Sequence, residues 1–196
     1  MTDPRKALRQ QLRHARRQLP ASERLAAAEG LARQVLNLPM AQDARGPVAG
    51  YWAMDGEIAL HRWQMQLPAG QTYCLPLLHG DTLRFAPWRP GQALSANRYG
   101  IPEPDIHPDD ALPAEAMALV LTPLVGFDAQ ARRLGMGGGW YDRSFAFRQQ
   151  RNAPPVLVGV GFALQQVDDL PIQPWDVPLD AICTESSTYF PDCPAP

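Results

Sequence analysis

Residues that cross-link chains or bind metals are scarce in this sequence. Its 196 residues include three cysteines and four histidines. No two cysteines form a C-x-x-C pair and their number is odd, so we expect reduced thiols, a cytoplasmic location and no disulfide framework. The histidines show no metal-ligand spacing with one another or with the cysteines, which argues against a zinc site.

Long hydrophobic runs and a strong net charge are also missing. No apolar stretch approaches the roughly 18 residues that cross a bilayer, and the charged amino terminus does not fit a secretory signal. The formal net charge of −2 gives no general attraction to nucleic acid or to an anionic membrane. We therefore expect a soluble protein without a nucleic-acid or membrane partner.

What the chain does contain is an alternation of strand patterns and amphipathic helix patterns. Periodic apolar residues predict helices, and continuous apolar runs predict buried strands. The predicted helices cover residues 5–19, 22–37 and 57–67, and the predicted strands cover 46–54, 72–77, 82–88, 118–121, 155–162 and 181–183. This order predicts an α/β fold: an open, Rossmann-like three-layer sandwich with a mostly parallel central sheet and helices on both faces.

The length suits one domain that can bury a core of its own. We place this domain at residues 1–190 and expect the basic helices within residues 1–38 to pack on its core. The proline-rich end at residues 191–196 is expected to form a loose tail.

A glycine cluster at residues 137–139 stands between a predicted strand and a predicted helix at 140–147. Glycine amides can adopt positive φ and approach an oxyanion closely, and a helix start adds unpaired N–H groups. Arginines at 132–133 and a carboxylate at Asp142 flank the cluster, which suits a polyphosphate carrying a divalent metal. The spacing matches neither common nucleotide-binding glycine motif, so a plain turn from strand to helix is the alternative.

The residues around this cluster resemble a known family. Leu121-Thr-Pro-Leu-Val-Gly-Phe-Asp128 and Arg133-Leu-Gly-Met-Gly-Gly-Gly-Trp-Tyr-Asp-Arg143 are similar to the signature of the 5-formyltetrahydrofolate cyclo-ligases, also called methenyltetrahydrofolate synthetases. The resemblance extends over nearly the whole chain. It includes the basic amino-terminal helix, Met54-Asp-Gly-Glu-Ile58, Tyr99-Gly-Ile-Pro-Glu-Pro104 and Trp175-Asp-Val-Pro-Leu-Asp180.

This resemblance implies a reaction. It is the ATP- and Mg²⁺-dependent cyclisation of 5-formyltetrahydrofolate to 5,10-methenyltetrahydrofolate, with release of ADP and phosphate. The formyl oxygen is expected to attack the γ-phosphate, giving an iminium phosphate intermediate that N10 then closes. Such a phosphoryl transfer requires mainly alignment and charge neutralisation from the protein.

The resemblance also implies site residues. Arg133 and Asp142 are the expected catalytic residues, and Asp142 and Asp180 are expected to support Mg²⁺. The loop at 99–104 is expected to border the substrate channel. The residues expected to contact the folate are Trp52, Met54, Glu57 and Trp140, with Glu57 accepting from the pterin N–H groups. The expected ATP site comprises Arg5, Lys6, Arg9, Arg133, Leu134, Gly135, Met136, Gly137, Gly138, Gly139, Trp140 and Tyr141.

Several of these residues have simpler explanations. Glu57 at a predicted helix start fits pairing with the helix dipole, and Asp180 before a strand fits a turn. The arginines at positions 13, 16 and 17 fit a solvated basic helix face.

The chain also departs from the family pattern at three positions. Arg5 stands where the family has a lysine, so the contact is expected to shift to Lys6. Many relatives have Arg at the position of Met136 and Tyr at that of Trp140, a difference expected to change nucleotide affinity more than the reaction. The competing functions are another α/β enzyme for a sugar phosphate or coenzyme A ester, and a non-catalytic regulator that binds folate or nucleotide.

Overall fold

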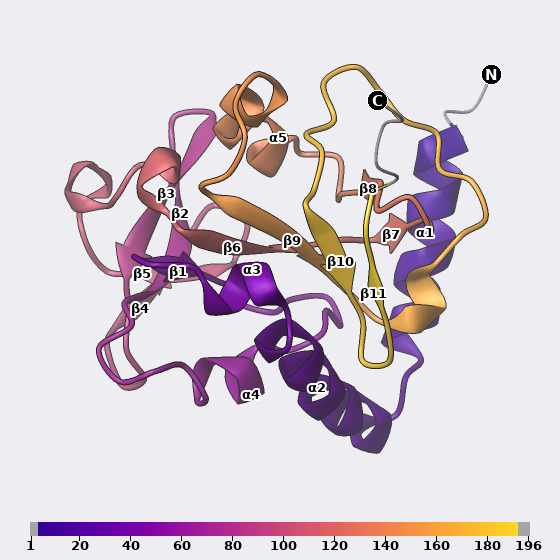
Figure 1. The fold of residues 1–196 in the computed structure, drawn as a ribbon, viewed down its shortest axis with the longest axis horizontal. Coiled ribbons are helices and arrows are strands. Elements are labelled where there is room, and N and C mark those ends of the chain that lie inside the picture. The colour runs from indigo at the N-terminus through magenta and orange to yellow at the C-terminus, as the bar shows by residue number, and fades with distance from the viewer. Residues whose placement is uncertain (1–3, 192–196) are drawn as a thin grey trace.

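The computed structural model describes residues 4–191, and a seven-stranded sheet organises them (Figure 1). The strands lie in the order β11-β10-β9-β6-β1-β2-β3, with the five inner strands parallel and both edge strands antiparallel. This confirms the predicted mostly parallel α/β architecture. The bounds are β1 Val48–Ala49, β2 Tyr73–His79, β3 Thr82–Pro87, β6 Leu119–Pro123, β9 Val156–Val160, β10 Ala181–Cys183 and β11 Thr188–Tyr189.

Two small hairpins stand outside this sheet. One joins β4 (Leu94–Ala96) to β5 (Pro102–Pro104), and the other joins β7 (Gly126–Phe127) to β8 (Arg133–Leu134). The second hairpin leads from the end of β6 into the glycine cluster. The predicted strand-loop-helix unit therefore contains an additional pair of short strands.

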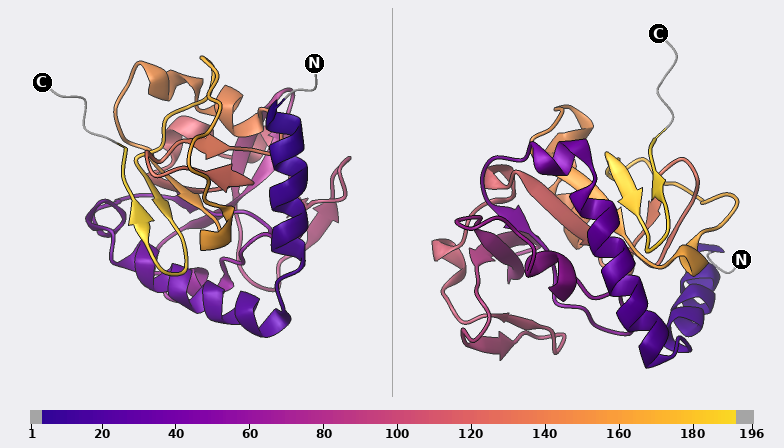
Figure 2. Two further views of the ribbon diagram at one scale, coloured as in Figure 1. Left: turned by 90° about the vertical axis from the view of Figure 1, so that its right-hand side faces the viewer. Right: turned by 60° about the horizontal axis from the view of Figure 1, so that its bottom comes forward.

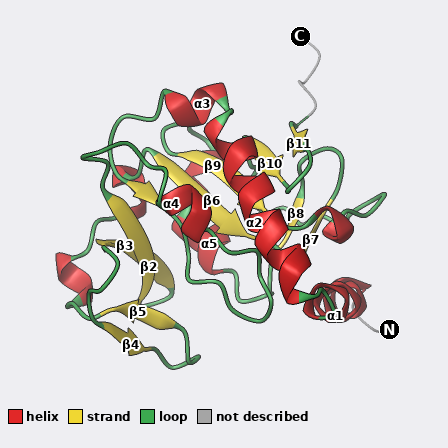
Figure 3. Ribbon diagram, turned by 90° about the horizontal axis from the view of Figure 1, so that it is seen from below, coloured by secondary structure: helices red, strands yellow, loops and turns green. Residues whose placement is uncertain are grey.

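Helices cover both faces of the sheet. In Figure 1, α5 lies above the sheet and α2, α3 and α4 lie below it, while α1 stands at one end beside β7 and β8. Figure 3, seen from below, shows α2, α3 and α4 in front of the sheet and α5 behind it. The bounds are α1 Pro4–Arg17, α2 Ala21–Leu36, α3 Pro39–Gln42, α4 His61–Gln64 and α5 Trp140–Ser144. Short 3-10 helices cover η1 Pro108–Asp110, η2 Ala114–Ala116, η3 Ala146–Gln149 and η4 Ala163–Gln165.

The continuous apolar strands are explained by burial on both faces. Leu119 and Leu121 of β6 pack in the core cluster that includes Leu31 of α2. Val120, between them, packs in the cluster on the other face with Phe145, next to α5. Successive side chains of a strand point to opposite faces, so a strand between two helix layers has no polar side.

Three predicted elements are shorter than expected. The strand predicted over residues 46–54 reduces to β1, because the chain leaves the sheet and turns where Asp55 and Gly56 adopt positive φ values of 52° and 77°. The helix predicted over 57–67 reduces to α4. The helix predicted over 140–147 divides at Phe145, where φ is −111° and ψ is 18°, into α5 and η3.

The ends of the chain bear on two further expectations. Five of the six residues of the predicted loose tail, 192–196, lie outside the described residues. Across residues 4–191, none of the helices combines the length and the apolar composition that crossing a membrane requires.

Candidate active site

The glycine cluster lies beyond the carboxyl end of β6, where open α/β sheets commonly bind ligands. Gly137 and Gly139 adopt φ values of 96° and 67°, which L side chains rarely adopt. Within the described chain, none of the backbone N–H groups of residues 136–139 donates a hydrogen bond to another backbone or side-chain group. Because α5 has only five residues, the glycine amides themselves, more than a helix dipole, are the feature of this loop that suits an anion.

Two arginines from different elements border these amides. Arg9 of α1 donates from Nε to the Gly135 carbonyl at 2.8 Å. A Cβ built on Gly137 would lie 3.4 Å from the Arg9 guanidinium carbon. Arg133 of β8 donates from Nη2 to Asp142 Oδ1 at 2.7 Å and from Nη1 to the Pro123 carbonyl at 3.5 Å. The structure therefore brings Arg9, Arg133 and Asp142 together around the glycine cluster.

The other basic residues near the predicted phosphate site pair with carboxylates or are exposed. Arg5 forms a two-bond ion pair with Asp176, at 3.0 and 3.2 Å, and the side chain of Lys6 is exposed. Arg132 binds Asp128 at 2.6 Å and Asp169 at 2.9 Å. Between the two neighbouring arginines, Arg133 therefore carries the charge beside the glycine cluster.

Glu57 stands directly after the positive-φ turn at residues 55–56. Its Oε2 accepts from the Met54 N–H at 2.9 Å, and its Oε1 lies 3.7 Å from Nη2 of Arg16. Only 11% of its side chain is exposed. Burial raises the pKa of Glu57, while the Met54 N–H and the charge of Arg16 oppose that rise.

Tyr141 connects the glutamate to the phosphate side of the site. Burial raises the pKa of the Tyr141 hydroxyl, the negative charge of Glu57 raises it further, and Arg133 lowers it. The Arg133 guanidinium also lies over the Tyr141 ring, 5.6 Å from its centroid. The hydroxyl makes no hydrogen bond within residues 4–191 and can therefore meet a ligand.

The remaining predicted folate residues are aromatic groups near these elements. The ring of Trp52 meets that of Trp88 edge to face at 5.8 Å, and 37% of Trp52 is exposed. Trp140 meets Tyr99 at 6.2 Å. Flat apolar faces and a buried carboxylate are the groups that suit an aromatic heterocycle with N–H groups on one edge.

Comparison with known proteins identifies the family. The family model described as the 5-formyltetrahydrofolate cyclo-ligase family matches residues 1–185. The chain belongs to the 5-formyltetrahydrofolate cyclo-ligase family. The 5-formyltetrahydrofolate cyclo-ligase of Haemophilus influenzae is 35% identical over 182 residues, covering 91% of this chain and 96% of that protein. The enzyme of Escherichia coli is also 35% identical over 182 residues, covering 91% of this chain and 98% of that protein.

Solved structures of the same family share the fold. The NMR structure of Aquifex aeolicus 5,10-methenyltetrahydrofolate synthetase has a TM-score of 0.81 and 26% identity, covering 98% of this chain and 95% of that chain. The Mycoplasma pneumoniae 5,10-methenyltetrahydrofolate synthetase has a TM-score of 0.67 at 22% identity, covering 94% and 100%, and supports the fold alone.

In this cyclo-ligase fold, the two predicted magnesium carboxylates bind different partners. Asp142 accepts at Oδ1 from Arg133 and, at 3.2 Å, from the Val177 N–H. Asp180 accepts from Arg148 at 2.7 and 2.8 Å and from the Leu157 N–H at 2.7 Å. The described residues hold no group of three or more His, Cys, Asp or Glu side chains arranged for a metal.

Sequence reasoning missed a buried charge network beside Glu57. Arg16, interpreted above as solvated, has a side chain exposure of 0%. It donates to the Asp55 carboxylate and carbonyl, each at 3.0 Å, and to the Leu124 carbonyl at 3.2 Å. Arg13 and Arg17 bind the same Asp55 carboxylate from the more exposed side. The solvated interpretation was wrong for Arg16 because α1 packs against the turn carrying Asp55.

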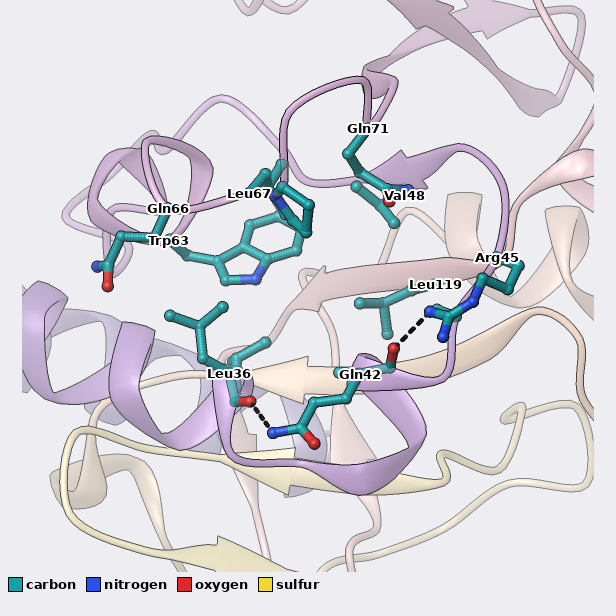
Figure 4. A pocket seen from close by; sticks show the side chains of 13 residues that line it. Leu36, Gln42, Arg45, Val48, Trp63, Gln66, Leu67, Gln71 and Leu119 are labelled. Atoms are coloured by element: carbon teal, nitrogen blue, oxygen red, sulfur yellow. Dashed lines mark hydrogen bonds between the residues drawn. The ribbon is translucent and has the colours of Figure 1, made fainter.

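One cavity among the described residues lies elsewhere. It has a volume of about 240 Å³ and includes Val48 and Leu119, the first residues of β1 and β6, so it lies at the amino end of these strands (Figure 4). Trp63 and Leu36 line it further, and Arg45 donates to the Gln42 carbonyl at its edge. None of the predicted site residues of the cyclo-ligase lines this cavity.

Proposed function

We propose that the chain catalyses the ATP-dependent cyclisation of 5-formyltetrahydrofolate to 5,10-methenyltetrahydrofolate, with release of ADP and phosphate. The position of Tyr141 carries the proposal, because the Arg133 guanidinium lies over its ring, 5.6 Å from the centroid, and the charges of Glu57 and Arg133 both act on the pKa of its hydroxyl. An acceptor for a pterin edge and an anion site for phosphate therefore lie close enough to serve one reaction. The names of the similar proteins, 5-formyltetrahydrofolate cyclo-ligases, agree with this assignment.

The reaction requires an oxygen to move from carbon to phosphorus. The formyl oxygen attacks the γ-phosphate, ADP leaves, and the formyl carbon becomes an iminium phosphate. N10 then attacks that carbon, loses its proton, and the oxygen departs with phosphate. The amides of residues 136–139, Arg9 and Arg133 stand where they can neutralise charge on the transferring group, the main requirement of such a transfer.

The proposed magnesium contact is Asp142. Its Oδ1 binds Arg133 and Val177, while Oδ2 accepts no hydrogen bond from residues 4–191. Mg²⁺ prefers oxygen ligands and usually combines one or two carboxylates with phosphate oxygens and water, and it would screen the phosphate charge here. Both oxygens of Asp180 bind Arg148, so we assign Asp180 a structural contact in place of the predicted metal contact.

Glu57 is the proposed acceptor for the pterin. An ionised carboxylate can accept two adjacent N–H groups, and Arg16 favours the ionised form despite burial. Trp52 and Trp140 would pack against the flat rings. The proposed setting is the cytoplasm, with the chain acting as a monomer; the buried cysteines Cys74 and Cys183 are free thiols.

A spectrophotometric assay tests the proposal. Protein, Mg²⁺, ATP and 5-formyltetrahydrofolate in slightly acidic buffer should raise the near-ultraviolet absorbance of the methenyl product, with one ADP formed per product. An unchanged spectrum with folded protein would contradict the assignment. Folate binding without ADP release would favour a regulator, and turnover of a sugar phosphate or coenzyme A ester would favour another enzyme.

A further inference from the structure

The cavity at the amino ends of β1 and β6 lies at the other end of these strands from the proposed active site. In the right-hand view of Figure 2, where the bottom of the molecule comes forward, α2 and α3 lie in front of the sheet. The cavity is lined by the ends of α2, α3 and α4 and by the first residues of β1 and β6. Its volume of about 240 Å³ is below the roughly 300–1,000 Å³ of sites for drug-sized ligands. It therefore suits one small molecule.

The walls of the cavity are mostly apolar and belong to the folded core. Val48, Trp63 and Leu119 line it and are 3%, 2% and 2% exposed. Side chains that the surrounding core already holds need little reordering when a ligand binds. The apolar part of the cavity is therefore preformed.

The indole N–H of Trp63 adds a polar donor to this apolar space. Figure 4 shows the indole nitrogen on the edge of the ring that faces Leu36 and Leu119. Within residues 4–191, this N–H donates to no acceptor. A buried donor normally has an acceptor, because leaving it unsatisfied costs free energy. The cavity therefore offers a hydrogen bond to an acceptor atom of a ligand.

Arg45 places a positive charge at the rim of the cavity. The lining contains no Asp or Glu, and Arg45 is its charged residue. Arg45 Nη1 donates to the Gln42 carbonyl at 2.8 Å, and Gln42 Nε2 donates to the Leu36 carbonyl at 2.8 Å. Arg45 forms no ion pair with a carboxylate of residues 4–191. The guanidinium is therefore held at the rim with its charge and further N–H donors available for an anion.

We infer that this cavity binds a small aromatic monocarboxylate that carries a hydrogen-bond acceptor on its ring. The ring packs against Trp63, the acceptor takes the indole N–H, and the carboxylate pairs with Arg45. A lining with one cation and no anion matches a single negative charge. This site is separate from the proposed active site and does not depend on the proposed function.

Calorimetric titration with 4-acetylphenylacetate tests the inference. A ligand of this size is expected to bind with a Kd of about 1 mM or lower. The 4-isopropyl analogue has a similar shape without the carbonyl oxygen, so it leaves the buried N–H unsatisfied and should bind about three- to tenfold more weakly. The corresponding amide, 4-acetylphenylacetamide, lacks the charge and should bind about two- to fivefold more weakly.

Variants assign the two polar contacts. Arg45→Gln should remove the difference between the carboxylate and the amide, whereas Arg45→Lys should keep most of it. Trp63→Phe keeps an aromatic ring without the N–H, so it should remove the difference between the acetyl and isopropyl ligands. Thermal unfolding checks that the Trp63 variant is folded. Arg33, an exposed arginine of α2 outside the cavity, is the matched control, and Arg33→Gln should leave all affinities unchanged.

Several results would overturn the inference. One is absence of binding of 4-acetylphenylacetate at about ten times the expected Kd. Another is equal affinity for the three ligands, or an unchanged carboxylate preference in Arg45→Gln, because binding would then be nonspecific. Displacement of the bound ligand by ATP or 5-formyltetrahydrofolate would place it in the active site instead. None of these measurements needs turnover, so they decide the cavity site even if the proposed function fails.

Discussion

Burial and the neighbouring positive charge act in opposite directions on the pKa of Glu57. Burial raises its pKa, and the Met54 N–H and Arg16 act against that rise. The other charged or titratable groups facing it are Arg13 and Asp55, with the hydroxyls of Tyr51 and Tyr141 nearby. A raised pKa means that acidification protonates Glu57 earlier than an exposed glutamate, and a protonated carboxyl loses acceptor capacity for the pterin N–H groups.

The pH dependence of folate use follows from this balance. We expect kcat/KM for 5-formyltetrahydrofolate to fall on the acid side as Glu57 protonates. In Arg16→Gln the opposing charge is absent, so the acid limb should move to higher pH, whereas Arg16→Lys should restore much of its position. Initial rates measured across pH, with thermal unfolding to confirm folding, check this. An acid limb at the same pH in Arg16→Gln would contradict the role of Arg16.

We expect opposite effects on kcat from substituting Asp142 and Asp180, although each of these aspartates is paired with an arginine. Asp142→Asn keeps an acceptor for Val177 but removes the charge beside Arg133 and the proposed Mg²⁺. We expect kcat to fall about 100- to 1,000-fold, comparable to the loss of one strong transition-state contact, and the unfolding temperature to fall as well, because the buried Arg133 loses its charged partner. Initial-rate assays and calorimetry measure the two effects. Full activity in Asp142→Asn would exclude its catalytic role.

Asp180→Asn is the matched comparison. It leaves the buried Arg148 guanidinium without a negative partner, and breaking such a pair costs about 3–5 kcal/mol. The variant should therefore unfold at a lower temperature, while kcat measured well below that temperature should remain close to the original. Loss of kcat at unchanged stability would restore Asp180 as a metal contact.

At the scale of elements, the Asp55 turn joins α1 to the sheet. Burial would raise the Asp55 pKa, but the hydrogen bonds and charges of Arg13, Arg16 and Arg17 outweigh it, and the pKa is lowered. An aspartate with a lowered folded pKa stabilises the fold above its unfolded pKa of about 4, and this contribution is lost as the pH falls through the folded value. The contribution of this turn to the stability of the fold should therefore decrease at acidic pH.

Urea unfolding as a function of pH tests this turn. At neutral pH we expect Asp55→Asn to cost about 3 kcal/mol, because the buried Arg16 loses its charged partner. The variant should also lose less stability on acidification than the unmodified protein. Arg17→Gln, which removes a half-exposed partner of the same carboxylate, should cost less than about 1 kcal/mol. Equal costs for the two variants would contradict the importance of the buried pair.

The elements that the sequence predicts are those whose signal is local. The α1 and α2 helices follow from apolar spacing, and the β2 and β3 strands follow from their apolar runs. The helix predicted over residues 57–67 is too long for a different reason. Its apolar residues Ile58 and Leu60 are buried in the core from the irregular segment that precedes α4, so their burial does not require the predicted helix to begin at residue 57.

At the scale of the whole molecule, charge pairing depends on which segments the sheet brings together. The sequence predicts the glycine cluster, Glu57 and Asp142 as site residues from local patterns. It does not reveal that Asp180 meets Arg148, a contact between residues 32 positions apart, or that Arg16 meets Leu124, 108 positions away. A charged residue on a helix face looks solvated until the element that covers it is known.

The unfolding temperature of the whole molecule reports the binding of nucleotide and magnesium to the folded chain. A ligand at 100 times its Kd stabilises the folded state by about 2.7 kcal/mol, which for a chain of this size raises the unfolding temperature by about 5–10 °C. We expect ATP with Mg²⁺ to produce such a rise and EDTA to remove part of it. In Asp142→Asn the response to EDTA should disappear, because the proposed carboxylate contact to Mg²⁺ is missing, whereas Asp180→Asn should keep it from its lower starting temperature. An EDTA response that vanished only in Asp180→Asn would exchange the two assignments and place the metal beside Arg148.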